Sequence, residues 1–176
     1  MGGPEGRLAD VQAIIESAKA RGGREALERF IERRLPASDL ARVGEAAEVV
    51  EEIVDSIPIF LARARQEAEA RKLESVVGPL LDHAERYFVQ PMDLIPEMTQ
   101  GLPGLMDDAY LVIRILQNLE KGPRPFLDWD LEYPMVFLRR IMGEEVSRRL
   151  DGIAIEAMEE ASAQLSVVWS HLAAEA

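Results

Sequence analysis

Apolar residues recur at steps of three and four along almost the whole chain, which is the spacing of one face of an α-helix. Near the start, Leu8, Val11 and Ile15 share such a face, and near the end Leu165 and Leu172 do the same. Glycine and proline separate the periodic segments, and we find no convincing strand pattern, internal repeat or long linker. The pattern predicts an all-α protein, a single-domain bundle of about seven helices.

The most regular apolar stripe spans residues 40–61. Its members alternate steps of three and four as in a heptad repeat: Leu40, Val43, Ala47, Val50, Val54, Ile57 and Leu61. Such a stripe packs either inside the protein's own bundle or against a second copy of the chain. We favour packing within the bundle and keep a homo-oligomer through residues 40–61 as the alternative. Pro58 lies inside the stripe and predicts a kink or an interruption there.

Residues 89–104 break the helical pattern with Pro91, Pro96, Gly101, Pro103 and Gly104. Helical periodicity then resumes with residue 105 and continues to residue 119. A Pro/Gly-rich helical hairpin is therefore expected within the bundle. The glycine-containing residues 1–6 are expected to be disordered. Residues 7–176 are expected to form one helical domain.

Charge narrows the range of partners. The chain has 32 acidic and 20 basic residues and a formal net charge of −12, which disfavours binding to nucleic acid or to anionic lipid. It has no cysteine, so disulfides and thiolate metal sites are excluded. No secretory signal is present, and no apolar run approaches the roughly 20 residues that span a bilayer. We therefore expect an acidic protein of the bacterial cytoplasm.

One segment carries a long, ordered motif over residues 87–111. The matching positions are Pro91, Asp93, Leu94, Ile95 and Pro96, followed by Gly104, Asp107, Asp108 and Ala109. This pattern resembles the YkvA-like family, a bacterial domain of unknown function, over roughly residues 78–119. The resemblance implies a helical hairpin and little about chemistry. Some relatives with a more apolar turn are suspected of membrane contact, which Glu97, Thr99 and Gln100 disfavour here.

The motif gathers the carboxylates Asp93, Glu97, Asp107 and Asp108 around one turn. Carboxylate oxygens on a proline-braced loop suit a hard cation such as Mg²⁺ or Ca²⁺, which could in turn serve a metal-dependent enzyme. Helix capping explains the same residues without an ion, because Asp107 and Asp108 would lie in the first turn of the next helix. We favour capping, and keep the metal site as the alternative.

An aromatic group lies in the loop that precedes the last two helices. Phe126, Trp129 and Tyr133 are close together there, near Phe137. Aromatic side chains on a loop either anchor a protein partner or fasten the loop to the core. We favour the second role, and keep Phe126, Trp129 and Tyr133 as candidate partner-binding residues.

Recognisable catalytic patterns are missing from the sequence. The two histidines are in no zinc-protease or di-iron spacing, and there is no phosphate-binding loop and no nucleophile elbow. We therefore expect a non-catalytic helical interaction or adaptor module that binds another protein and needs no cofactor. A metal-binding protein or enzyme built on the acidic turn is the first alternative, and a peripheral membrane protein is the second.

Overall fold

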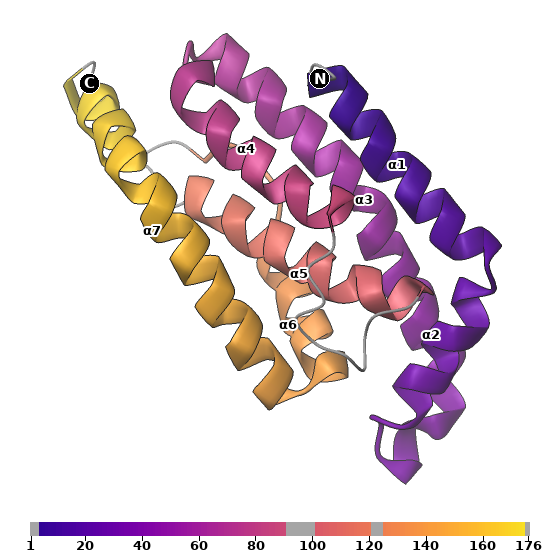
Figure 1. Cartoon of the computed structure of the whole chain (residues 1–176). Coiled ribbons are helices and arrows are strands. Elements are labelled where there is room, and N and C mark those ends of the chain that lie inside the picture. The colour runs from indigo at the N-terminus through magenta and orange to yellow at the C-terminus, as the bar shows by residue number, and fades with distance from the viewer. Residues whose placement is uncertain (1–3, 91–100, 121–124, 175–176) are drawn as a thin grey trace.

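The computed structural model describes residues 4–90, 101–120 and 125–174, and over these residues the chain is an all-α, single-domain bundle without strands (Figure 1). A short 3-10 helix, η1, precedes α3. The helices are α1 (Pro4–Ala20), α2 (Gly23–Glu32), η1 (Ala37–Arg42), α3 (Val43–Ala70), α4 (Glu74–Val89), α5 (Gly101–Leu119), α6 (Glu132–Met142) and α7 (Glu144–Ala174). The fold class and the seven α-helices predicted from the periodicity are thus confirmed within these ranges.

The helix α5 lies at the centre of the bundle. It contacts each of the six other α-helices, and most of its residues are buried on every side rather than along one stripe. A helix that is apolar all round is expected only where neighbours surround it completely. Tyr110, Met106 and Leu102 are among its large, fully buried side chains. In Figure 1, α7 runs along one side of α5, and α3 and α4 lie on the other.

A close contact fixes the start of α2 against this central helix. Gly22 has a φ of +73°, a left-handed conformation that glycine adopts without strain. A Cβ atom on the next residue, Gly23, would lie 2.5 Å from the carbonyl oxygen of Ala18 and 2.8 Å from Cγ of Leu102. Helix α1 ends at Ala20, just before these glycines, and Gly23 lets α2 approach α5.

The apolar stripe of residues 40–61 packs inside the bundle. Ala47, Val50, Val54, Ile57 and Leu61 are fully buried in one chain. These five side chains are therefore used inside the bundle, whereas Leu40 at the start of the stripe is 43% exposed, and a homo-oligomer through residues 40–61 stays a prediction. The helix α3 also continues through Pro58 to Ala70, so the predicted interruption is wrong.

Two predicted boundaries also differ from the structure. Helix α1 begins at Pro4, so the expected disorder does not extend over residues 4–6. Helix α5 begins at Gly101, four residues before the predicted start at Leu105. Proline is tolerated in the first turn of a helix because its missing N–H would have no helical partner there. Pro4 and Pro103 both lie in the first turn of a helix, although the sequence analysis interpreted Pro103 as a helix breaker.

Candidate interaction surface

A groove runs between the first half of α3 and α6. Arg140 on α6 lies in the groove near Asp39 of η1, which precedes α3. Outside the groove, the ring of Phe60 in the second half of α3 lies with its centroid 4.8 Å from that of Trp129, which precedes α6. The two helices therefore run in opposite directions. Helix α6 packs directly on α5 and α7, and side chains bridge the space between α6 and α3.

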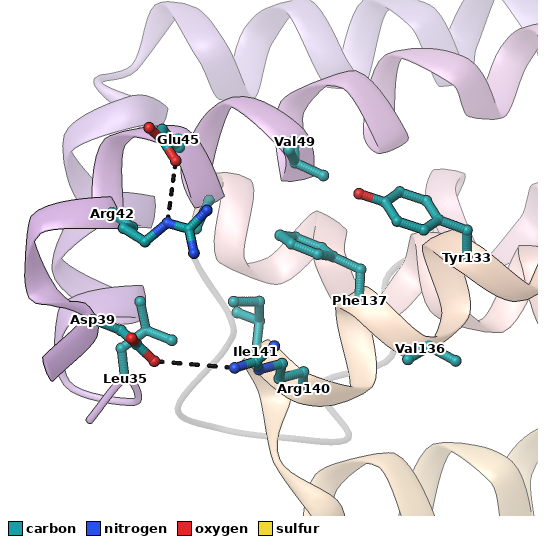
Figure 2. Close-up of a pocket in the computed structure, with 11 residues that line it drawn as sticks. Leu35, Asp39, Arg42, Glu45, Val49, Tyr133, Val136, Phe137, Arg140 and Ile141 are labelled. Atoms are coloured by element: carbon teal, nitrogen blue, oxygen red, sulfur yellow. Dashed lines mark hydrogen bonds and ion pairs between the residues drawn. The ribbon is translucent and has the colours of Figure 1, made fainter.

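Apolar side chains form the floor and walls of this groove, which has a volume of about 410 Å³. Figure 2 shows Tyr133 and Phe137 pointing from α6 toward α3, with Val49 opposite Phe137. The apolar and aromatic lining consists of Leu35, Ala46, Val49, Tyr133, Val136, Phe137 and Ile141. The rings of Tyr133 and Phe137 stack with their centroids 6.4 Å apart.

The three aromatic residues singled out in the sequence occupy different environments. Phe126 is buried, and the guanidinium of Arg71 lies 4.4 Å from the centre of its ring. Trp129 is 39% exposed and Tyr133 is 61% exposed. Phe126 thus fastens the loop to the core, while the other two present aromatic surface to solvent beside the groove.

Charged residues of both signs border the groove at its η1 end. Arg42 lies 3.4 Å from Glu45, and Arg140 lies 4.0 Å from Asp39 (Figure 2). Arg42 and Arg140 are both largely exposed. Exposed ion pairs of this kind contribute little to stability, so their guanidinium groups can exchange partners at low cost.

Sequence reasoning missed part of this surface. Val136 is 59% exposed and lines the groove, yet it stands in an ordinary helical pattern between buried residues. The available signal was its spacing, because Val136 follows Tyr133 by three residues and precedes Arg140 by four. That spacing places an aliphatic, an aromatic and a basic side chain on one face of α6.

Asp107 and Asp108 of the acidic turn do not lie in the first turn of a helix, where the capping prediction placed them. Asp107 and Asp108 are the seventh and eighth residues of α5, counted from Gly101, so they lie beyond its first turn. Both are buried, and the Oδ1 atom of Asp107 accepts a hydrogen bond of 2.8 Å from the backbone N–H of Asp108. Capping of the helix start by these two carboxyls is therefore wrong, because the helix begins earlier than its proline and glycine residues suggested.

Burial strongly affects the protonation of these two carboxyls. It raises the pKa of Asp107 to about 7, against the lowering effect of two backbone hydrogen bonds. It also raises the pKa of Asp108 to about 9, with the neighbouring Asp107 carboxyl adding to the rise. Asp93 and Glu97 lie outside the described residues. Among the residues that the structure does describe, no three acidic or histidine side chains are grouped to hold a metal, so the Mg²⁺ or Ca²⁺ site stays a prediction.

A second set of buried charges joins α1, α3 and α4. Arg65 donates hydrogen bonds to Glu85 at 2.9 Å and to Asp82 at 2.7 Å. Arg7 donates to the same oxygen of Asp82 at 2.7 Å, and its Nε lies 3.2 Å from the second Glu85 oxygen without hydrogen-bond alignment. Burial raises the pKa of Glu85, although the bonds with Arg65 oppose that rise. Each acid in this cluster has a guanidinium partner, so we interpret the cluster as a structural set of ion pairs that holds α1, α3 and α4 together.

No helix in the described part of the chain is long and apolar enough to cross a membrane. The comparisons with known proteins add no relative: no family model matches the chain, and no match was found among curated proteins or solved structures. The resemblance of residues 78–119 to the YkvA-like family therefore stays a prediction, and the geometry of the surface is what bears on function.

Proposed function

We propose that this protein is a non-catalytic helical interaction module, and that it binds a protein partner through the groove between α3 and α6. The observation that carries the proposal is that Tyr133 and Val136 are largely exposed and line an apolar groove, while Trp129, just before the same helix, is partly exposed. Large apolar side chains that gather in solvent mark a contact surface more often than scattered ones do. Tryptophan, tyrosine and arginine are also the residues that dominate the energy of protein interfaces.

The shape of the groove suits a helical segment. Its two walls are antiparallel helices, and its apolar floor is bordered by charged residues at the η1 end. An amphipathic helix places apolar side chains at steps of three and four into such a groove and leaves its polar face in water. The eleven residues of α6 extend about 16 Å, or roughly three turns, which sets the length of a matching segment.

The test is a native affinity purification of the tagged chain from its source cell, followed by mass spectrometry of bound proteins. The informative variant is Val136→Ser, and the matched control is Ile155→Ser on α7, because the two side chains are 59% and 57% exposed. We expect a stoichiometric partner with the wild type and the control, and its loss with Val136→Ser. Equal recovery of that partner with both variants would reject this groove as the binding surface.

A further inference from the structure

The exposed face of α6 has a symmetric order of charges around Val136. Glu132 precedes Val136 by four residues, and Arg140 follows it by four. Residues four apart lie on the same face of a helix. Glu132, Val136 and Arg140 are all exposed. Along α6 this face therefore presents an acidic, an apolar and a basic residue in turn, with the apolar Val136 at its centre.

This order is complementary to itself when the helix is reversed. Four residues extend about 6 Å along a helix axis, so both charges lie equally far from Val136. In an antiparallel pair of α6 helices centred on Val136, Glu132 of each copy is level with Arg140 of the other. A two-fold axis therefore creates two identical ion pairs, one on each side of a Val136–Val136 contact. Two-fold interfaces need this self-complementarity.

We propose that the partner that covers α6 is a second copy of this chain, bound antiparallel through Glu132, Val136 and Arg140. The inference rests on the proposed function, because it names the occupant of the same surface. The charge of −12 on each chain opposes self-association in general. Two copies can meet only where local charges compensate for that repulsion, and the face of α6 supplies this compensation.

The charged groups of this face are free to pair in a dimer. The guanidinium of Arg140 is 75% exposed, and its contact with Asp39 is long, at 4.0 Å. Within the described residues, the Glu132 carboxylate takes part in no ion pair, although the backbone N–H of Glu132 donates to Asp130. Forming the dimer would therefore break no strong interaction of the monomer.

Aromatic side chains extend the contact beyond the three central residues. Tyr133 lies three residues before Val136, so in the antiparallel pair it is level with residue 139 of the other copy, next to Arg140. An arginine over a tyrosine ring adds a cation–π attraction. Trp129 lies one turn further out and is also exposed. The contact is small for a stable dimer, so we infer an equilibrium that depends on protein concentration.

Charge reversal at the two positions provides the test. We expect the purified wild-type chain to dimerise as its concentration rises to about 1 mM in sedimentation equilibrium. Arg140→Glu places two acids opposite each other at both ends of the contact, and Glu132→Arg places two bases there. Each variant alone should dimerise at least about tenfold more weakly than the wild type, because like charges in an interface are strongly unfavourable.

Mixing the two variants restores complementary charges at both ends, so a heterodimer should form with an affinity close to that of the wild type. A structural effect of either substitution would not produce this rescue. Loss of dimer without rescue on mixing, or a dimer that neither variant weakens, would overturn the α6 contact. A wild-type chain that stays monomeric up to about 1 mM would also overturn it.

If the wild type stays monomeric, the proposed function still holds provided that the wild type binds a different protein in the affinity purification and that Val136→Ser fails to bind it. If Val136→Ser loses no protein and the wild type stays monomeric, both proposals fail. The two experiments therefore distinguish a wrong partner from a wrong surface.

Discussion

Two helices of this bundle bury carboxyl groups, and they do so in opposite ways. Glu85 on α4 is fully buried and lies between two guanidinium groups, those of Arg65 and Arg7. Asp107 and Asp108 on α5 are buried beside each other, and no cation faces them among the described residues. The first arrangement holds a charge in the interior, while the second favours a neutral, protonated pair.

The difference shows that burial alone does not fix the role of an acid. A paired carboxylate links helices, and its removal leaves a buried cation without its partner. Two acids with raised pKa values instead bind protons in the folded state that the unfolded state releases. Stability then depends on pH, and the pair becomes a place where a proton or a cation could bind.

The largest expected effect concerns the unpaired acids and the substitution Asp108→Asn. The unfolded carboxyl releases its proton above its ordinary value of 3.8, whereas the folded carboxyl keeps it up to about 9. Folding stability therefore falls as the pH rises between these two values, and asparagine removes that loss. The variant should gain on the wild type by about 1.4 kcal/mol per pH unit. Urea unfolding at several pH values measures this difference.

The same experiment contains its own control. Below about pH 3 the wild-type Asp108 is protonated in both the folded and the unfolded state and resembles asparagine, so the two proteins should unfold at similar urea concentrations. Wild-type and variant curves that stay parallel from about pH 5 to 8 would show that Asp108 is ionised in the folded protein, contrary to its raised pKa.

The paired acid should respond in the opposite direction. Glu85→Ala leaves the buried Arg65 without one of its partners and should lower the free energy of unfolding by about 3 kcal/mol or more. The double variant Arg65→Met with Glu85→Leu replaces both charges by apolar groups and should lose much less. Urea unfolding of these variants, together with the single variants Arg65→Met and Glu85→Leu, tests this prediction. A double variant whose loss of stability equals the sum of the losses in those two single variants would contradict the ion-pair account.

Helical periodicity was sufficient to predict the fold class and the helix count, because steps of three and four continue through most of the chain. It could not predict the surroundings of α5. Pro103 and Gly104 read as breakers in the sequence, but they lie in the first turn of that helix, where proline is tolerated. The burial of Asp107 and Asp108 follows from the other helices that surround α5, and no local pattern records that arrangement.

The interaction surface was predictable only in part, for a related reason. The density of aromatic residues in the sequence pointed to Trp129 and Tyr133. The same density also pointed to Phe126, which is buried under Arg71. Whether an aromatic side chain faces the core or solvent depends on where α3 lies relative to α6. Val136 was missed because an exposed valine in a helix has the same periodicity as a buried one.

The smallest expected effect concerns Asp151 on α7. Its surroundings are intermediate between those of Glu85, which is paired with cations, and those of Asp108, which is not paired with any in the described part of the chain. Its oxygens accept hydrogen bonds from the Tyr110 hydroxyl and from Arg139, both at 2.6 Å. Burial, followed by the hydrogen bond to Asp151, raises the pKa of Tyr110, so its hydroxyl stays a donor. Tyr110→Phe removes that donor but leaves Asp151 its ion pairs with Arg139 and Arg114, and should cost about 1.5 kcal/mol.

Thermal unfolding measures this cost, with Tyr133→Phe as the matched control because that side chain is mostly exposed. The control should melt like the wild type. If Tyr110→Phe is as stable as its control, the arginines alone satisfy Asp151, and this carboxylate belongs with Glu85 as a charge held by cations. If it loses about 1.5 kcal/mol, the buried phenol is a necessary third partner, and α5 satisfies the neighbouring polar groups Asp108 and Tyr110 in different ways.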